Sequence, residues 1–385
     1  MGVDLPLDAA VGTMSMANKQ LVAIARALSM DARILFMDEP TTAITTKEVG
    51  RLLAIVQDLR ERGLSVVFIS HKLDEVFEIA DSITIFRDGR KVGDFPAAQL
   101  DQDSLGFHMT GREVLHKPYE RTGRTEDEAS LLDVADLTKE PHYRRVSLNV
   151  RPGDVVGLTG LLGAGRTELA LSLFGLNPPD SGTITIAGEK VDIGAPWDAI
   201  RLGIALVPED RHTQGLFNKA TIGRNISSTR LDSLLTRVGL IDRRAECRLA
   251  RTAVEESGVN NKDIDAVCGN LSGGNAQKVV IGKWMATEPT VFILDSPTVG
   301  IDVGSKSEIY DRVHALARQG KGVILISDEP EEIITNCNRI LVMHEGDVLA
   351  QFSNDDRHAP GFKERLTRLI ADPASAAPLE SGAAR

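Results

Sequence analysis

The sequence predicts an α/β fold with a mostly parallel sheet that occurs twice in the chain, the first time incompletely. Three observations support this prediction. Short apolar runs suited to strands alternate with amphipathic helical segments, which is the pattern of a parallel sheet with helical connections. Two stretches of the chain match each other in one register. A glycine-rich segment stands between a strand and a helix in the second stretch.

The internal repeat is defined by two apolar runs that end in aspartate. Asp38 follows Ile34–Met37 and Asp295 follows Val291–Leu294, at an offset of 257 positions. The same offset aligns further identical residues: Ser15 with Ser272, Gln20 with Gln277, Ile44 with Ile301, Gly63 with Gly320, Glu75 with Glu332, and Gly89 with Gly346. The register holds without a gap for about eighty residues, whereas unrelated sequences agree at about one position in sixteen. The two stretches are therefore predicted to be copies of one domain.

The elements of the first copy follow from periodicity. Residues 18–29 have the period of a helix, and Arg33–Met37 is an apolar run typical of a buried parallel strand. Lys47–Arg62 is an amphipathic helix that stops at a glycine, and the strand Ser65–Ser70 follows it. This order is that of an α/β unit.

Composition divides the chain into four parts. Residues 1–112 form the partial first domain, and residues 113–130 are polar and charged, as expected of an exposed linker. Residues 131–372 form the complete second domain. The tail, residues 373–385, is rich in Ala, Ser and Pro and is expected to be disordered.

The first copy lacks the glycine-rich segment of the second. Subtracting the offset from Gly160, the first residue of that segment, gives −97, which lies before Met1. Either the sequence lacks an N-terminal segment of roughly 100 to 130 residues, or the gene product is a decayed subunit. The start within a domain favours the first explanation, and it predicts a poorly stable first half whose sheet misses its central strands.

Composition and charge exclude several classes of protein. The chain has 385 residues and a net charge of −11, which differs from the basic balance of a general nucleic-acid binder. No apolar run approaches the roughly 20 residues that span a bilayer, and the N-terminus has no secretory signal. Cys247, Cys268 and Cys337 lie far apart, as expected of reduced, buried thiols in a cytoplasmic protein.

The glycine-rich segment Gly160–Thr167 follows a predicted strand, Val155–Thr159, and precedes a predicted helix over Glu168–Phe174. Its pattern, G-x-x-x-x-G-[K/R]-[S/T], predicts a phosphate loop, in which backbone N–H groups surround phosphate oxygens at a helix N-terminus. Arg166 stands where the motif has lysine and keeps the positive charge. Thr167 is expected to place its hydroxyl on Mg²⁺. The candidate nucleotide ligands are Gly160, Gly163, Ala164, Gly165, Arg166, Thr167 and Glu168. The alternative is a glycine-rich turn that serves only packing.

Two further segments of the second copy fit a nucleotide site. Asp295 closes an apolar strand, where a carboxylate can hold Mg²⁺ through water; the alternative is a helix cap. Ser272, Gly273 and Gly274 open a helix with a hydroxyl and free N–H groups, which suits an anion. The alternative, that Ser272 caps its own helix, is compatible with an anion site.

Together these segments resemble the nucleotide-binding domain of ABC transporters, with Leu271–Asn275 as the signature. More narrowly, Gly160–Leu169, Val207–Arg211 and Gly300–Gly304 resemble the second half of the duplicated ATP-binding subunits of bacterial sugar importers of the ribose, galactose and xylose types. The resemblance covers nearly the whole chain. It implies a P-loop NTPase-type sheet with a helical subdomain, the cofactors ATP and Mg²⁺, and a place at the cytoplasmic face of the inner membrane. It also implies inner-membrane permease subunits as partners, a periplasmic sugar-binding protein as an indirect partner, and no nucleic acid.

The resemblance implies two composite sites, because ABC domains pair head to tail and each ATP lies between the loop of one copy and the signature of the other. One site joins the second copy's loop, Asp295 and Glu209 to Ser15, in a first-copy signature region that lacks both glycines. Glu209 takes a place near Mg²⁺. Ser296 replaces the usual catalytic glutamate, and Asp328 stands at the position of the switch histidine. This site is expected to bind ATP and to hydrolyse it poorly.

The other site combines the signature Leu271–Asn275 with Asp38, Glu39 and His71 of the first copy. By the same resemblance Asp38 binds the metal, Glu39 acts as general base or orients water, and His71 contacts the γ-phosphate. The alternatives are surface charge for Glu39 and a structural role for His71. Because the first copy's phosphate loop is missing, this polypeptide alone is not expected to complete the site.

The predicted function is that of an ATP-binding subunit that couples ATP binding and hydrolysis to carbohydrate import across the inner membrane. An alternative from a different class is a catalytically inactive nucleotide-binding scaffold. A second alternative is a soluble tandem ABC factor that acts on ribosomes, which is expected to have a long basic helical linker. Residues 113–130 are short and of mixed charge.

Overall fold

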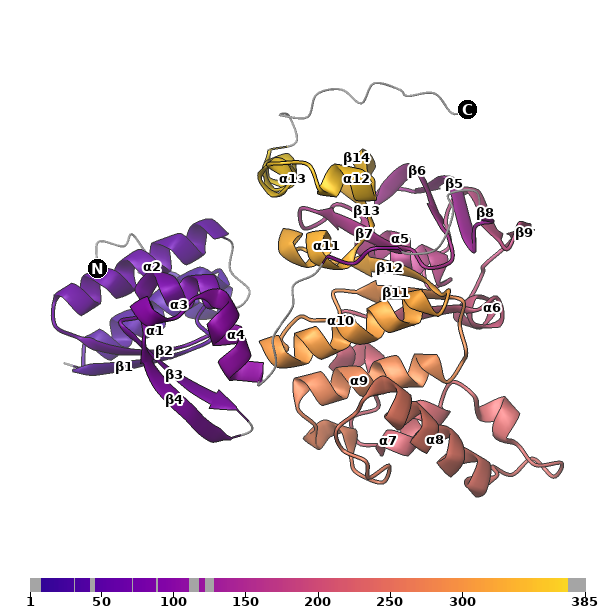
Figure 1. Cartoon of the computed structure of the whole chain (residues 1–385), viewed down its shortest axis with the longest axis horizontal. Helices are drawn as coiled ribbons and strands as arrows, with labels where there is room; N and C mark the ends of the chain where they lie inside the picture. The colour runs from indigo at the N-terminus through magenta and orange to yellow at the C-terminus, as the bar shows by residue number, and fades with distance from the viewer. Residues whose placement is uncertain are drawn as a thin grey trace. The chain divides into compact units, whose positions relative to one another are not determined.

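The chain forms two compact units, Met1–Val114 and Leu115–Arg385. The computed structural model describes residues 8–30, 32–41, 46–70, 72–87, 89–110, 118–121 and 128–372 (Figure 1). Within these ranges, no helix combines the length and the apolar character needed to cross a bilayer.

The first unit contains one parallel strand pair and one antiparallel hairpin. Its elements are a 3₁₀ turn at Val11–Thr13, α1 at Met16–Leu28, β1 at Ile34–Asp38, α2 at Thr46–Glu61, β2 at Ser65–Ile69, α3 at Leu73–Ile79, β3 at Ser82–Arg87, β4 at Arg90–Pro96, a 3₁₀ turn at Ala97–Gln99, and α4 at Gln102–Thr110. Leu21 of α1, Leu35 of β1 and Leu53 of α2 belong to one buried apolar cluster. The helices therefore cover one face of the β1–β2 pair, as the predicted periodicity requires.

The second unit is built on a six-stranded sheet in the order β10-β11-β12-β7-β13-β14, in which only β14 runs antiparallel. A second, antiparallel sheet has the order β6-β5-β8-β9. The strands are β5 at Leu132–Lys139, β6 at Tyr143–Val150, β7 at Val155–Gly160, β8 at Ser181–Ile186, β9 at Glu189–Val191, β10 at Ile204–Val207, β11 at Val291–Asp295, β12 at Gly322–Ile326, β13 at Arg339–His344 and β14 at Asp347–Phe352.

The helices of the second unit cover the six-stranded sheet and also form a separate helical group, α7 to α9 (Figure 1). They are α5 at Arg166–Leu173, α6 at Pro196–Arg201, a π-helical turn at Arg211–Gly215, α7 at Ile222–Ser227, α8 at Arg243–Ser257, α9 at Gly273–Met285, α10 at Val303–Arg318, α11 at Pro330–Asn336, α12 at Asn354–Arg357 and α13 at Phe362–Ala371, with 3₁₀ turns at Leu231–Leu234 and Cys268–Asn270. Every residue of β7, β11 and β12 is buried, which explains their continuous apolar sequences. The predicted α/β class with a mostly parallel sheet is confirmed.

The repeat is visible in the backbone of the two parallel strand pairs. Ile34 pairs with Ser65 in the first unit, and Val291 pairs with Gly322 in the second, so both parallel pairs have the same register. The offset of 257 holds for every one of these positions. The two stretches are therefore structural copies in this part of the fold.

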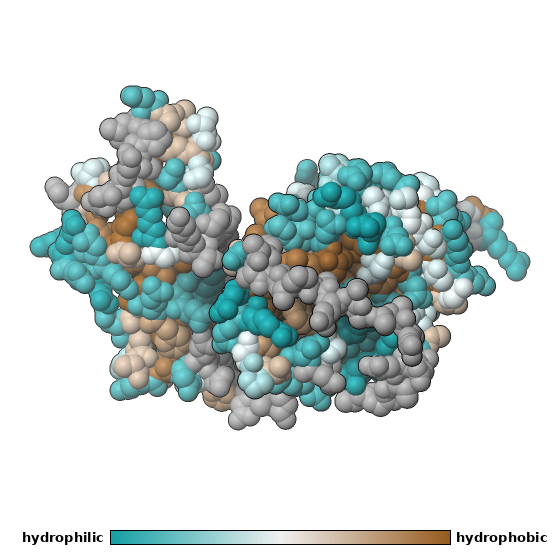
Figure 2. All heavy atoms as spheres, turned by 90° about the horizontal axis from the view of Figure 1, so that it is seen from above, coloured by the Kyte–Doolittle hydropathy of each residue, from teal (hydrophilic) through white to brown (hydrophobic). Residues whose placement is uncertain are grey.

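The copies differ in how their sheets are covered. In the second unit β10 lies beside β11 and β7 beside β12, whereas the described part of the first unit has only β1 and β2 in its parallel sheet. The face of β1–β2 formed by Ile34, Phe36, Val67 and Ile69, called here the bare face, is exposed. Its counterparts Val291, Ile293, Ile324 and Ile326 are buried. Figure 2 shows that hydrophobic residues reach the molecular surface among hydrophilic ones.

Part of the segment 113–130 is packed rather than exposed, which differs from the sequence expectation. Tyr119 is buried, its ring stacks on that of His314 at 4.7 Å between centroids, and its hydroxyl donates to the Gly153 carbonyl at 2.8 Å. Arg121 forms an ion pair with Glu128 at 2.8 Å. A tyrosine can bury its ring when its hydroxyl has a hydrogen-bond partner. The charge pattern of the segment, on which the expectation of exposure is based, does not predict such packing. Residues 113–117, 122–127 and the tail 373–385 lie outside the described residues.

The three cysteines differ in their exposure to solvent. Cys268 and Cys337 are buried, as expected, and form no disulfide. Cys247 is exposed, so the expectation of a buried thiol is wrong at this position. It lies on α8 next to Arg248, which is also exposed, whereas the buried residues of this helix include Glu246 and Ala250.

Candidate functional site

The phosphate loop connects the buried strand β7 to α5. Gly165 precedes the helix with a φ of 93°, and a Cβ there would lie 2.4 Å from the His142 carbonyl oxygen. A Cβ at Gly160 would lie 2.1 Å from the Met343 carbonyl oxygen. Close packing therefore requires glycine at these two positions, whether or not the loop binds phosphate. Gly163 differs, because its φ is 82° and open space lies around it, so its backbone is accessible from outside.

Arg166 is the first residue of α5 and its side chain is only 7% exposed. Its Nη2 lies 2.5 Å from Oδ1 of Asp328, in the loop between β12 and α11. Nη1 donates to the Ser327 carbonyl and Nη2 to the Leu161 carbonyl, both at 3.3 Å. The guanidinium is thus held by the neighbouring loop in this structure.

Asp295 ends β11 and is 3% exposed. Burial raises the pKa of its carboxyl to about 6, and the charges of Glu209 and Asp328 act in the same direction. A hydrogen bond with Thr167 and the charge of Arg166 lower that pKa. The hydrogen bond between Thr167 and Asp295 places the loop beside the end of β11 in the second unit.

The environment of Asp295 fits a divalent cation. Its Oδ1 is buried and has no hydrogen-bond partner among the described residues. The helix-cap alternative is wrong for Asp295, because α10 begins with Asp302 as its N-cap, which accepts from the Ser305 N–H at 2.9 Å. The described ranges hold no group of three or more His, Cys, Asp or Glu side chains suited to a metal. Mg²⁺ is commonly held by one or two protein oxygens together with water and phosphate, and Asp295 and Thr167 would be the two protein oxygens of such a set.

Ser296 and Glu39 follow the two strand-end aspartates in the same backbone conformation. Their φ angles are 44° and 42°, and their N–H groups donate to the Ile326 and Ile69 carbonyls at 3.0 and 2.9 Å. Asp38 and Glu39 are exposed, whereas Asp295 is buried. Only Glu39 carries a carboxylate that can accept a proton or orient water; Ser296 has a hydroxyl. His71, the other predicted catalytic residue, lies outside the described residues.

The signature residues of the second unit serve its own packing. Ser272 is the N-cap of α9 and its hydroxyl accepts from Asn275 Nδ2 at 3.0 Å. A Cβ at Gly274 would lie 2.3 Å from Ser305 Oγ on α10, and one at Gly273 would lie 2.9 Å from Arg211 Nη2. Ser272 therefore caps its own helix, and the glycines permit close approach of neighbouring groups.

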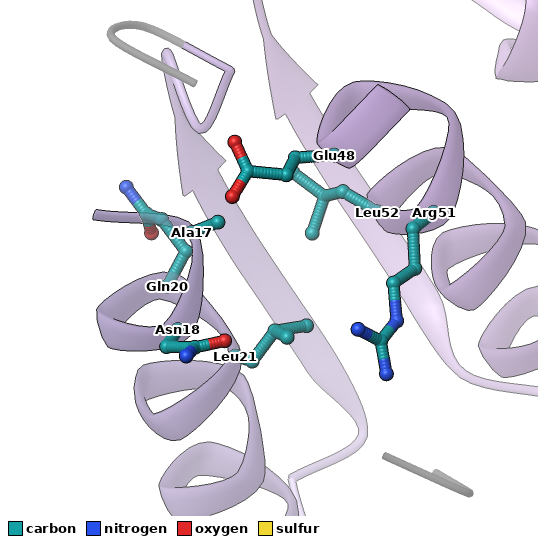
Figure 3. Close-up of a pocket in the computed structure, with 7 residues that line it drawn as sticks. All are labelled: Ala17, Asn18, Gln20, Leu21, Glu48, Arg51 and Leu52. Atoms are coloured by element: carbon teal, nitrogen blue, oxygen red, sulfur yellow. The ribbon is translucent and has the colours of Figure 1, made fainter. Parts of the chain in front are cut away.

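The first copy's signature region has a different environment. Ser15 is the N-cap of α1 and accepts from the Asn18 N–H at 3.3 Å, as Ser272 does in its helix. At the offset of 257, Ala17 corresponds to Gly274 and Glu48 to Ser305. Instead of a tight contact, a pocket of about 40 Å³ opens between α1 and α2 (Figure 3). Its lining consists of Ala17, Asn18, Gln20, Leu21, Glu48, Arg51 and Leu52.

Among the predicted site residues of the second unit, Thr167, Arg166, Glu209 and Asp295 lie near one another, whereas Ser272, Gly273 and Gly274 lie apart from them at the start of α9. The described site residues of the first unit lie at α1 and at the end of β1. The sequence reasoning missed two contacts of the site. The first is the ion pair between Arg166 and Asp328, which are 162 positions apart in the chain. The sequence indicates it only through their opposite charges in the segments that follow β7 and β12. The second involves Arg211, the last residue of the motif Val207–Arg211. Its guanidinium donates to the Val299 and Gly300 carbonyls at 2.7 and 3.2 Å and stabilises the turn after β11.

Comparison with solved structures supports the fold. A nucleotide-free ATP-binding cassette from an ABC transporter aligns with a TM-score of 0.54 and 20% identity, over 64% of this chain and 96% of that structure. An ATP-binding cassette in a dimeric post-hydrolysis state with bound ADP and phosphate aligns with a TM-score of 0.51 and 20% identity, over 58% of this chain and 98% of the other.

Comparison with curated sequences gives longer matches. The ribose import ATP-binding protein RbsA 2 of Rubrobacter xylanophilus is 43% identical over 382 residues, which are 99% of this chain and 73% of that protein. A putative ribose/galactose/methyl galactoside import ATP-binding protein of Hahella chejuensis is 43% identical over 90% of this chain and 67% of its own length. The family model described as ABC transporter matches residues 3–42 and 143–299. This chain belongs to the family of ABC transporter ATP-binding proteins.

Proposed function

We propose that this chain is the ATP-binding subunit of an importer for ribose or a related sugar. The observation that carries the proposal is the arrangement of Arg166, Thr167 and Asp295 around the open backbone of a phosphate loop. The similarity to import ATP-binding proteins at 43% identity supports the sugar class. Mg²⁺, when bound between Asp295 and Thr167, would neutralise phosphate charge. A nucleotide that bridges two halves of such a pair shifts them toward a closed state, and the membrane subunits would use that closure.

Hydrolysis is proposed to be weak at this loop. Ser296 takes the place of the carboxylate that orients water, and the composite site would be completed by Ser15, which no glycines follow. The stronger catalytic set is proposed to be Glu39 and His71, with Asp38 as the metal ligand and Ser272, Gly273 and Gly274 as the signature that would complete the site. That set requires a second phosphate loop. Glu209 is proposed to act near the metal, because its charge already influences Asp295.

The partners are proposed to be inner-membrane permease subunits, with this chain bound peripherally at the cytoplasmic face and a periplasmic binding protein engaged only through the permease. The loop before α8 supports a protein partner, because it exposes large apolar side chains, namely Leu231, Leu235, Val238, Leu240 and Ile241. Such a concentration of exposed apolar residues is unusual on a solvated surface.

The direct test is titration of the purified chain with MgATP by calorimetry, together with a phosphate-release assay. We expect saturable binding and turnover close to background. The absence of binding contradicts the proposal, and so does robust turnover that disappears in a Glu39→Gln variant, because that result requires a complete first site.

A second candidate function, a nucleotide-binding scaffold without its own turnover, is favoured by Ser296. The two functions are separated by turnover measured with and without permease subunits in nanodiscs. Stimulation by the permease, lost in a Val238→Ser/Leu240→Ser double variant, supports the importer. Unchanged turnover supports the scaffold.

A further inference from the structure

The strongest unexplained contact at the phosphate loop is the ion pair between Arg166 and Asp328. The nitrogen that meets Asp328 at 2.5 Å is Nη2 of Arg166, the side chain that the proposed function assigns to phosphate binding. The two other bonds of this guanidinium, to the Ser327 and Leu161 carbonyls, are longer, at 3.3 Å. The carboxylate is therefore the closest acceptor of the guanidinium.

A carboxylate and a phosphate compete for the same donors. Both accept the planar fork of an arginine side chain, and both are negatively charged. Arg166 is largely buried, so its guanidinium has few other directions in which to turn. Asp328 is 62% exposed, so water can solvate its carboxylate after it leaves. An incoming anion can therefore take the place of the Asp328 carboxylate at Arg166, because that carboxylate can move into solvent.

From this geometry we propose that Asp328 is an internal anion that pairs with Arg166 and that nucleotide phosphates must displace from it. Asp328 then lowers the affinity of the loop for a triphosphate. The proposal rests on the proposed function, because it concerns the same loop. It makes Asp328 a residue that sets nucleotide affinity by holding Arg166.

The neighbouring residue Glu329 provides a matched comparison. It carries the same charge one position further along the same loop, but it pairs with Lys306 on α10 at 3.1 Å. Neutralising Glu329 removes one negative charge from the same loop without releasing Arg166. A difference between the two positions therefore reports on the pair and not on the net charge of the surface.

The experiment measures the dissociation constants of MgATP and of inorganic tripolyphosphate for the full chain and for Asp328→Asn, Asp328→Ser and Glu329→Gln. Tripolyphosphate has no base or sugar and isolates the competition between anions. We expect both Asp328 variants to bind both probes about three- to tenfold more tightly, a modest gain because the carboxylate is exposed and screened. Glu329→Gln is expected to remain within about twofold of the wild type.

The outcomes separate this inference from the function on which it rests. If the wild type binds MgATP but neither Asp328 variant gains affinity, the displacement of Asp328 is refuted while nucleotide binding stands. An equal gain in Glu329→Gln refutes it as well, because general charge then explains the effect. If no variant binds either probe, the proposed function fails and the inference with it. Thermal melts identify a variant that does not fold. If one of the two Asp328 variants does not fold, the other is used for the comparison.

Discussion

The hydroxyl of Thr298 donates to the Glu332 carboxylate at 2.8 Å, across 34 positions of the chain. The first unit repeats this bond between Thr41 and Glu75, at 2.7 Å. Both carboxylates are buried, so each depends on hydrogen-bond donors that the fold supplies. The strand that ends in aspartate and the helix that follows the next strand are linked in the same way in both copies.

Thr298→Val is therefore expected to lower the free energy of unfolding by about 1–3 kcal/mol, because a buried carboxylate loses a donor. Tyr310 and Ser327 still donate to Glu332, at 2.6 and 2.8 Å, which limits the loss. Urea denaturation followed by circular dichroism measures the change. Thr298→Ser keeps the hydroxyl and is expected to stay close to the wild type; a Thr298→Val variant as stable as the wild type would contradict the expectation.

The bare face of β1–β2 predicts a difference in stability between substitutions at two positions that correspond in the repeat. Phe36 is 71% exposed, whereas its counterpart Ile293 is 0% exposed. Ile293→Ala is expected to lower the free energy of unfolding by about 2–5 kcal/mol through the cavity that it leaves. Phe36→Ala is expected to stay within about 0.5 kcal/mol, as for an ordinary surface substitution. Chemical denaturation of the two variants measures both effects, and a large loss at Phe36 would show that the face is covered in solution.

Asp295 predicts a pH dependence of stability. Its pKa is about 6 in the folded protein against an ordinary value of 3.8, so folding takes up a proton between these values. The free energy of unfolding contributed by this group is therefore highest below pH 4 and falls as the pH rises to 6, by about 2–3 kcal/mol at roughly 1.4 kcal/mol per unit. Asp295→Asn removes this dependence and is expected to be more stable than the wild type at pH 7 without Mg²⁺.

Denaturation curves at several pH values test this expectation as the difference between wild type and Asp295→Asn. The difference isolates Asp295 from other groups, such as His314, whose pKa burial lowers to about 4. A difference that does not change between pH 4 and 7 would mean that the Asp295 carboxyl titrates normally.

Thr167→Val tests the metal assignment. The hydroxyl is expected to be a ligand of Mg²⁺ and contributes little to metal-free nucleotide binding, so the variant should lose about tenfold in MgATP affinity. In excess EDTA its affinity for ATP is expected to match that of the wild type. Calorimetric titrations with and without Mg²⁺ make the comparison; an equal loss under both conditions would assign Thr167 to packing or to direct phosphate contact.

Much of the fold follows from local patterns in the sequence. The offset of 257 between Asp38 and Asp295 predicts the common register of β1–β2 and β11–β12. Two strands with the same hydrophobic pattern and the same separation in sequence are expected to pair in the same register. The apolar run before Asp295 predicts a buried strand, since only a strand covered on both faces needs no polar positions. Ser272 is found as a helix cap from its place before a helical period.

The contacts that local patterns did not reveal join distant parts of the chain. The approach of Asp328 to Arg166 depends on the order of β7 and β12 in the sheet, which periodicity does not determine. The packing of Tyr119 depends on a surface formed by Gly153 and His314, far along the chain. Gly160 and Gly165 are explained by the backbone of Met343 and His142, which no motif includes.

The single exposed cysteine on α8 offers a handle for spectroscopy. Burial raises the pKa of the Cys268 thiol to about 11 and also raises that of Cys337, so both remain protonated and unreactive near neutral pH. Cys247 is left as the thiol that a maleimide reagent reaches. A fluorophore can therefore be attached to the helical part of the second unit without engineering the natural sequence.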